Sequence, residues 1–185
     1  MLAQIREISK NKAICQRIEL KENYNELPYA LHLIVAPTKN MSRYEWMVEK
    51  STEIGVTSIS PIICQRSERK HLRLERLEKI ALSAMKQSLK ATQPMLKEPQ
   101  AFGEWLYHLK GQKIVCSGSA DQHFSQVLDK DQPVNLLIGP EGDFTEDEMT
   151  LAANYGFIPV NLGQQRLRTE TAAVVASALV ASLSH

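Results

Sequence analysis

Apolar and polar residues alternate near the start of the chain, at 2–8 and again at 13–20, on either side of a polar stretch at 10–12. Alternation with a period of two predicts a β-hairpin. An isolated hairpin is marginally stable in water, so these strands either pair with another element or belong to a larger β domain. Residues 23–28 are rich in turn formers and predict a linker.

Further along the chain, short continuous apolar runs replace the alternation, which is typical of strands buried on both faces of a parallel sheet. Segments with helical spacing separate these runs. Strands that alternate with helices predict an α/β fold, in which a parallel sheet has helices on both faces. The expected strands are 31–36, 56–64, 113–116, 134–138 and 157–160, and the expected helices are 43–54, 72–91, 102–109, 145–156 and 169–183.

Helix ends are marked by capping residues. Ser42 with Glu45, and Thr145 with Glu148, have the spacing of a capping box, and Gly55 is expected to end the first helix. Thr169 or Thr171 begins the final helix, which has almost no polar face between 172 and 181. A helix that is apolar all round is expected to be buried all round, as a central core helix would be.

Composition limits the class of protein. The chain has 185 residues, of which 43% are hydrophobic and 23% charged, as expected for a globular domain with a core of its own. Its three cysteines form no CxxC pair and no metal-ligand spacing with histidine, which predicts free thiols in a reducing compartment and no metal. No apolar run approaches the roughly 20 residues that cross a bilayer, and no signal peptide is visible, so we expect a cytoplasmic protein without a membrane partner.

Positive charge is concentrated in one segment. Residues 66–90 contain eight basic and three acidic side chains and so carry +5, whereas the whole chain carries +1. A local basic surface on a nearly neutral protein is suited to phosphate contacts, although a solvated helix face gives the same pattern. The candidates for RNA contacts are Arg66, Arg69, Arg73 and, from a later loop, Arg166.

Two glycine-bearing loops, at 139–144 and 162–171, are the candidate ligand site. Each follows a predicted parallel strand and leads into a helix, which is where α/β sheets place ligands. Neither loop is a phosphate cradle, because the chain contains neither GxxxxGK[ST] nor GxGxxG. Taken alone, the GPEG sequence at 139–142 is also typical of a tight turn between a strand and a helix.

The two loops together resemble one family. IGPEGDF at 138–144 and LGQQRLRTETA at 162–172 are similar to the ribosomal RNA small subunit methyltransferase E family, a member of the trefoil-knotted SPOUT class. EKSTEIGV at 49–56, Pro61 and the KQS sequence at 86–88 with Pro94 resemble further motifs of that family. Asp143 stands where the family commonly has a second glycine.

The resemblance implies a fold, an activity and a cofactor. Residues 29–185 are expected to form the knotted methyltransferase domain, and residues 1–28 to be a truncated part of a PUA-like RNA-binding β-barrel plus linker. The implied reaction is methylation of N3 of a uridine in 16S ribosomal RNA by a homodimer, with S-adenosylmethionine bent inside the knot. The expected cofactor contacts are Ile138, Gly139, Pro140, Glu141, Gly142, Leu162, Gly163, Leu167, Thr169, Thr171 and Ala172.

Chemistry suggests roles for charged residues near these loops. Uracil N3 is a poor nucleophile until it loses its proton, and a fixed positive charge beside the developing anion lowers that cost. Arg168 is the candidate for this charge, and Glu170 or Glu141 accepts the proton or orients Arg168. Two alternatives stay open for the site: Arg168 and Glu170 form a salt bridge at the start of a helix, and Lys50 and Glu53 form a structural pair.

Two other functions are compatible with the sequence. The chain is either a non-catalytic RNA-binding fragment of such an enzyme or a generic nucleotide-binding α/β protein. Binding of S-adenosylmethionine separates the methyltransferase from the generic protein, and methyl transfer to small ribosomal subunits separates it from the fragment.

Overall fold

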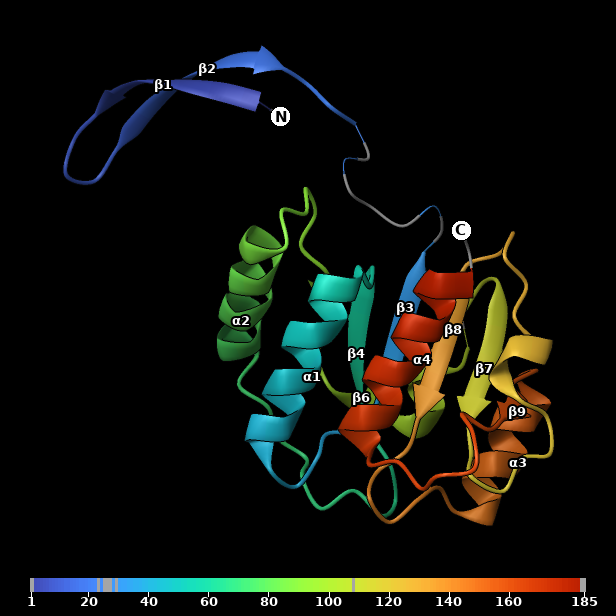
Figure 1. Ribbon diagram of the computed structural model, residues 1–185. Coiled ribbons are helices and arrows are strands. Elements are labelled where there is room, and N and C mark those ends of the chain that lie inside the picture. Colours follow the sequence, from blue (N-terminus) through green and yellow to red (C-terminus); the bar gives the residue numbers. More distant parts are fainter. Residues whose placement is uncertain (1, 23, 25–27, 29, 108, 184–185) are drawn as a thin grey trace.

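The computed structural model describes residues 2–22, 24, 28, 30–107 and 109–183. Strands β1 (Leu2–Ile8) and β2 (Ala13–Glu19) form a two-stranded antiparallel sheet, which confirms the predicted hairpin. Figure 1 shows this hairpin apart from the main sheet, and nearly all of its residues are exposed. The predicted linker at 23–28 lies largely outside the described residues.

The main sheet has seven strands, and all of its pairings are parallel. Its order is β5-β4-β3-β8-β7-β9. Strand β6 also pairs with β4, further along β4 than the residues that pair with β5. Strands β3 and β8, buried at nearly every position, lie at its centre, as their continuous apolar runs predicted. The strands are β3 (Leu31–Val35), β4 (Ser58–Ile63), β5 (Met95–Leu96), β6 (Gln100–Ala101), β7 (Gln112–Cys116), β8 (Val134–Ile138) and β9 (Ile158–Val160).

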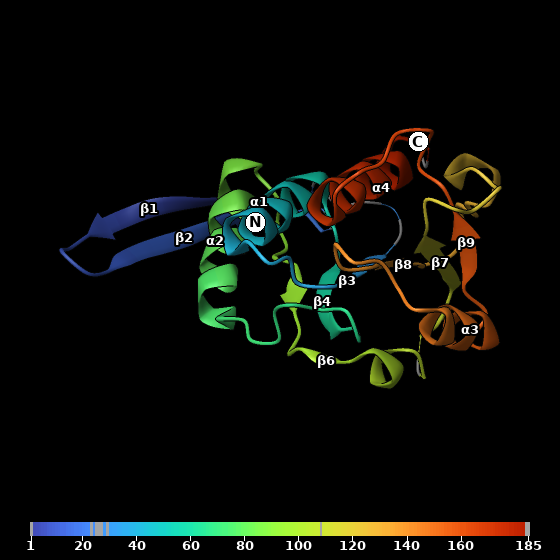
Figure 2. The same ribbon diagram turned by 90° about the horizontal axis from the view of Figure 1, so that it is seen from below.

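Helices cover both faces of this sheet, as predicted. Figure 2 shows α1 and α4 on one face and α3 on the other, with α2 beside α1 at the end of the sheet that carries β5. The side chains of β3 alternate accordingly: Leu33 joins one buried cluster with Met47 of α1, whereas Ile34 joins a second cluster with Ala152 of α3. The helices are α1 (Met41–Ile54), α2 (Leu74–Gln87), α3 (Glu146–Asn154) and α4 (Thr169–Leu183), with short 3-10 turns η1 (Phe102–Trp105) and η2 (Phe124–Gln126).

The predicted capping residue of α1 was wrong. Asn40, rather than Ser42, is the N-cap, and its side chain accepts a hydrogen bond of 3.0 Å from the Ser42 amide. Glu45, the expected partner in a capping box, instead accepts a hydrogen bond of 2.8 Å from Arg76 of α2. The expected end of α1 is confirmed, because Gly55 adopts a left-handed φ of 117°. The capping box of Thr145 and Glu148 at the start of α3 is also confirmed.

Three other helix predictions need correction. The helix expected at 102–109 is only a 3-10 turn, η1, over Phe102–Trp105. Helix α2 ends at Gln87, short of residue 91, because the chain turns at Leu89, whose φ is 55°. Helix α4 is not buried all round: it packs on the sheet and on α1 through one face, whereas Val174, Val175 and Leu179 are partly exposed and Ala178 is exposed. In the described part of the chain, no helix is long and apolar enough to span a membrane.

Replacement of Asn40 by alanine should destabilise the native state by about 1 kcal/mol, because an amide in the first turn of α1 loses its acceptor. Ser42→Ala is the matched control and should change stability little, since the Ser42 side chain is not the cap. Urea unfolding of both variants measures this difference. Equal destabilisation by the two changes would restore Ser42 as the cap.

Candidate functional site

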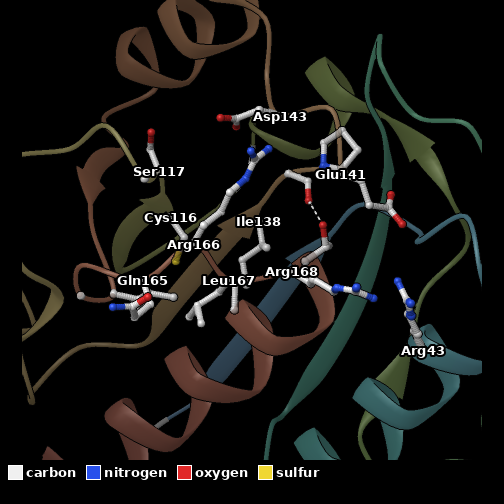
Figure 3. A pocket seen from close by; sticks show the side chains of 17 residues that line it. Arg43, Cys116, Ser117, Ile138, Glu141, Asp143, Gln165, Arg166, Leu167 and Arg168 are labelled. Atoms are coloured by element: carbon white, nitrogen blue, oxygen red, sulfur yellow. Dashed lines mark hydrogen bonds between the residues drawn. The ribbon is translucent and has the colours of Figure 1, made fainter.

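The carboxyl ends of the central strands lie at one edge of the sheet, and the loops that follow them enclose a cavity of about 570 Å³ (Figure 3). Its walls come from the loop after β8, the loop between β9 and α4, the end of β7 and the first turns of α1 and α4. The lining residues are Arg43, Cys116, Ser117, Gly118, Ile138, Gly139, Pro140, Glu141, Asp143, Leu162, Gly163, Gln165, Arg166, Leu167, Arg168, Thr169 and Ala172.

The two glycine-bearing loops meet in this cavity, and one hydrogen bond joins them. The Thr169 hydroxyl, at the start of α4, donates to the Gly139 carbonyl over 2.9 Å. Gly163 adopts a φ of 115°, a left-handed conformation that glycine reaches without strain. Asp143, where a second glycine was expected, has a φ of 62°, and its carboxylate accepts a hydrogen bond of 2.8 Å from the Phe144 amide. Aspartate therefore fulfils the backbone requirement of that turn.

Nine of the eleven predicted cofactor contacts line the cavity. Gly142 and Thr171 do not line it, and their contacts with the cofactor stay predictions. Gly142 is next to Arg66, whose Cβ would lie 3.2 Å from a Cβ added at this glycine. Thr171 belongs to α4, where Thr169 and Ala172, three positions apart, share the face turned to the cavity.

Of the catalytic candidates, Arg168 and Glu141 line the cavity and Glu170 does not. Glu141 is exposed, and its Oε1 accepts a hydrogen bond of 2.9 Å from the Lys39 amide, which orients the carboxylate. Glu170 is buried, and its Oε1 lies 3.7 Å from Nε of Arg43 in α1. Within the described residues, the buried carboxylate therefore has its ion pair with Arg43 and none with Arg168.

The candidate RNA-binding arginines occupy different environments. Arg66 donates to the Gly142 carbonyl over 3.0 Å, and Arg69 donates to the Lys39 carbonyl over 2.9 Å. Because these acceptors are uncharged, they fix the two guanidinium groups without neutralising them. Arg73 is exposed at the start of α2, and Arg166 lines the cavity.

Another contact holds the segment that carries Arg66 and Arg69. The Gln65 amide donates to the buried Glu148 carboxylate over 2.8 Å, which ties the loop after β4 to the start of α3.

In α1, Lys50 pairs with Glu53 over 2.8 Å and with Glu49 over 2.7 Å, and both partners raise its pKa. The structural pair between Lys50 and Glu53 is therefore confirmed.

Sequence reasoning missed six lining residues: Arg43, Cys116, Ser117, Gly118, Asp143 and Gln165. Residues 116–118 end and follow a strand that was predicted correctly, so the rule that ligands bind at the carboxyl edge already pointed to them. Arg43 carried no such signal, because only the packing of α1 against α4 brings it to the cavity. The described residues contain no cluster of three potential metal ligands.

Cys116 is partly exposed on the cavity wall, and its thiol is held in the protonated form. Burial raises the pKa of the Cys116 thiol to about 12. Burial and the neighbouring Glu148 carboxylate likewise raise the pKa of Cys64 to about 12. Thiolate is the reactive form of cysteine, so both side chains are poor nucleophiles at neutral pH.

Known proteins share this architecture. A family model described as an RNA methyltransferase domain matches residues 25–181. Ribosomal RNA small subunit methyltransferase E of Synechocystis is 30% identical over 98% of the chain, and that of Rickettsia conorii is 30% identical over 100%. The chain spans 62% of the first relative and 77% of the second. The crystal structure of a Neisseria gonorrhoeae ribosomal RNA small subunit methyltransferase E, bound to S-adenosylmethionine, superposes with a TM-score of 0.90 at 30% identity, covering 98% of this chain and 77% of that one.

The parallel sheet, the cavity between two joined loops and the domain match define an RNA methyltransferase domain. More narrowly, the chain belongs to the ribosomal RNA small subunit methyltransferase E family.

Thr169→Val should destabilise the protein by about 1 kcal/mol, because the hydroxyl that bonds the Gly139 carbonyl is lost at a buried position. Thr169→Ser keeps the hydroxyl and should lose less stability than Thr169→Val. Denaturant unfolding of both variants tests this order. A valine variant as stable as the wild type would show that the bond between the loops does not stabilise the fold.

Iodoacetamide at pH 8 should modify Cys15, which is exposed, while leaving Cys64 and Cys116 unmodified in the native protein. Their raised pKa values keep both thiols protonated until the pH approaches about 12. Peptide mapping by mass spectrometry before and after unfolding in urea measures the difference. Rapid alkylation of native Cys116 would contradict the protonated state.

Proposed function

We propose that this chain transfers the methyl group of S-adenosylmethionine to N3 of a uridine in 16S ribosomal RNA of the small subunit. The cavity shared by the loops at 139–144 and 162–168 carries this proposal, together with the family to which the chain belongs. Its volume, about 570 Å³, lies within the range of about 300–1,000 Å³ typical of cofactor sites.

The cavity wall suits an adenosine group. Ile138, Leu162, Leu167 and Ala172 offer apolar surface for the flat ring, and both loops bring backbone donors and acceptors to the same cavity for its polar edge. These residues, with Gly139, Pro140, Glu141, Gly163 and Thr169, would hold the cofactor. When bound, S-adenosylmethionine supplies an electrophilic methyl group on a positively charged sulfur.

Two residues of the chain prepare the uridine. Arg168 places a permanent positive charge where the uracil anion develops, which lowers the free energy needed to remove the N3 proton. Glu141, oriented by the Lys39 amide, accepts that proton. The lone pair of N3 then forms the bond to the methyl carbon, while the electron pair of the broken carbon–sulfur bond stays on sulfur.

The RNA backbone follows the basic loop after β4. Arg66 and Arg69 are fixed by backbone carbonyls and retain their charge for phosphates. Arg73 extends this basic surface at the start of α2, and Arg166 contacts the RNA at the cavity.

In this proposal the hairpin and linker at 1–28 belong to an RNA-binding β domain, and residues 29–185 form the methyltransferase domain. Ribosomal RNA as substrate puts the reaction in the cytoplasm.

The fold is proposed to contain a trefoil knot and to act as a homodimer. From β9, at one end of the sheet, the chain returns to lay α4 over β3 and β8, a path compatible with threading through a loop. The partly exposed apolar face of α4 (Val174, Val175, Ala178 and Leu179) supplies surface that a second copy can bury.

Arg168→Ala should lower methyl transfer to unmethylated small ribosomal subunits by on the order of 100-fold, because a fixed charge beside the anion is lost. Its affinity for S-adenosylmethionine, measured by calorimetry, should stay unchanged. Lys130→Gln, an exposed cation in the loop before β8, is the control for loss of charge. Undiminished turnover by Arg168→Ala would contradict the assigned role.

Cofactor binding and methyl transfer, both measured on the wild-type protein, distinguish the candidate functions. Absence of cofactor binding by the native chain would overturn the whole proposal. Cofactor binding without any methyl transfer would favour the non-catalytic RNA-binding fragment.

A further inference from the structure

Glu170 is a buried carboxylate whose charge is only partly compensated. Its side chain is 8% exposed, and within the described residues its Oε2 atom is buried without a hydrogen-bond partner. The other oxygen lies 3.7 Å from Nε of Arg43, which is too long for a hydrogen bond and close enough for a strong electrostatic attraction. A buried charge is costly unless it is paired, so Glu170 restrains the position of Arg43.

Arg43 reaches the cavity from α1. Its side chain is 42% exposed and lines the cavity wall. Figure 3 shows the guanidinium groups of Arg43 and Arg168 pointing toward one another from two different elements, near the carboxylate of Glu141. Among the described residues, Glu170 is the only acid within ion-pair distance of Arg43. The attraction acts at Nε, so the Nη groups keep their donors for a ligand.

The chemistry of the proposed substrate needs two such donors. When uracil loses its N3 proton, the negative charge spreads over N3 and over the two carbonyl oxygens that flank it. One arginine can face only one of these oxygens while N3 stays open toward the methyl group. A second fixed cation on the opposite side would complete the stabilisation of the anion.

We infer that Arg43 is this second catalytic arginine: it donates to one carbonyl oxygen of the uracil, Arg168 donates to the other, and Glu170 is the positioning residue of Arg43. The inference rests on the proposed function and deepens it. It also separates the two acids, because the exposed Glu141 accepts the N3 proton, whereas the buried Glu170 holds an arginine in place.

The experiment compares Arg43→Ala, Arg43→Lys and Glu170→Gln with Lys130→Gln as the charge control. Single-turnover methyl transfer to unmethylated small subunits gives the rate, calorimetry gives the affinity for S-adenosylmethionine, and thermal unfolding reports on the fold. Arg43→Ala should lose on the order of 100-fold in rate at unchanged cofactor affinity. Arg43→Lys should recover part of that loss. Glu170→Gln, which removes only the positioning charge, should lose about tenfold.

The pH dependence distinguishes this role from a structural one. The positive charge of Arg43 lowers the pKa of N3 in the bound uridine, so its removal should cost most at low pH. As the pH rises and hydroxide makes deprotonation easier, the ratio of wild-type to Arg43→Ala rates should fall. Damage to the fold or to RNA docking would give a ratio that does not change with pH.

Several outcomes would overturn the inference. A weaker affinity of Arg43→Ala for S-adenosylmethionine at unchanged rate would make Arg43 a cofactor ligand. A raised KM for the subunit at unchanged kcat would make it a phosphate contact. Full activity of Arg43→Ala together with an inactive Glu170→Gln would return the role of proton acceptor to Glu170. If the wild-type protein transfers no methyl group, the proposed function fails as well, and that result is distinct from the other three.

Discussion

The hydrogen bond between Thr169 and the Gly139 carbonyl joins two loops that lie thirty positions apart in the sequence. It can form because β3, β7 and β8 are parallel, so their carboxyl ends share one edge of the sheet. The bond fixes the start of α4 against the end of β8 and closes the cavity between them. Arg168 and the apolar residues Ile138 and Leu167 line the cavity beside this bond.

Most of the fold could be predicted from the chain because burial is periodic. The runs at 31–36 and 134–138 are buried on both sides, and the structure has them as central strands. Two-residue strands such as β5 are too short to show a period. The cap of α1 was missed because the Ser42 pattern fitted a rule, whereas Glu45 had a stronger partner on α2. That competition depends on tertiary packing.

For the site, too, local sequence patterns could be used for prediction, whereas contacts that depend on tertiary packing could not. Loop positions followed from the rule that ligands bind at the carboxyl edge of a parallel sheet, so Gly163 and Pro140 were found. Gly142 lies against Arg66 and not on the cavity wall, a contact between residues far apart in the sequence that no local pattern shows. Arg43 could not be predicted because its place on the cavity wall also depends on contacts between distant parts of the chain. The pairing of Glu170 with Arg43 depends on how α1 packs against α4, which no local pattern records.

Cys116 lies on the wall of the cavity that we propose holds the methyl donor. Thiolates attack activated methyl groups more readily than uracil does. An ionised cysteine on the cavity wall would therefore take the methyl group of the cofactor in place of the RNA and inactivate the protein. The raised pKa, about 12, keeps this thiol in its inert form at physiological pH. In the proposed enzyme, one sulfur atom that stays protonated beside the methyl donor would spare the site from methylation by its own cofactor.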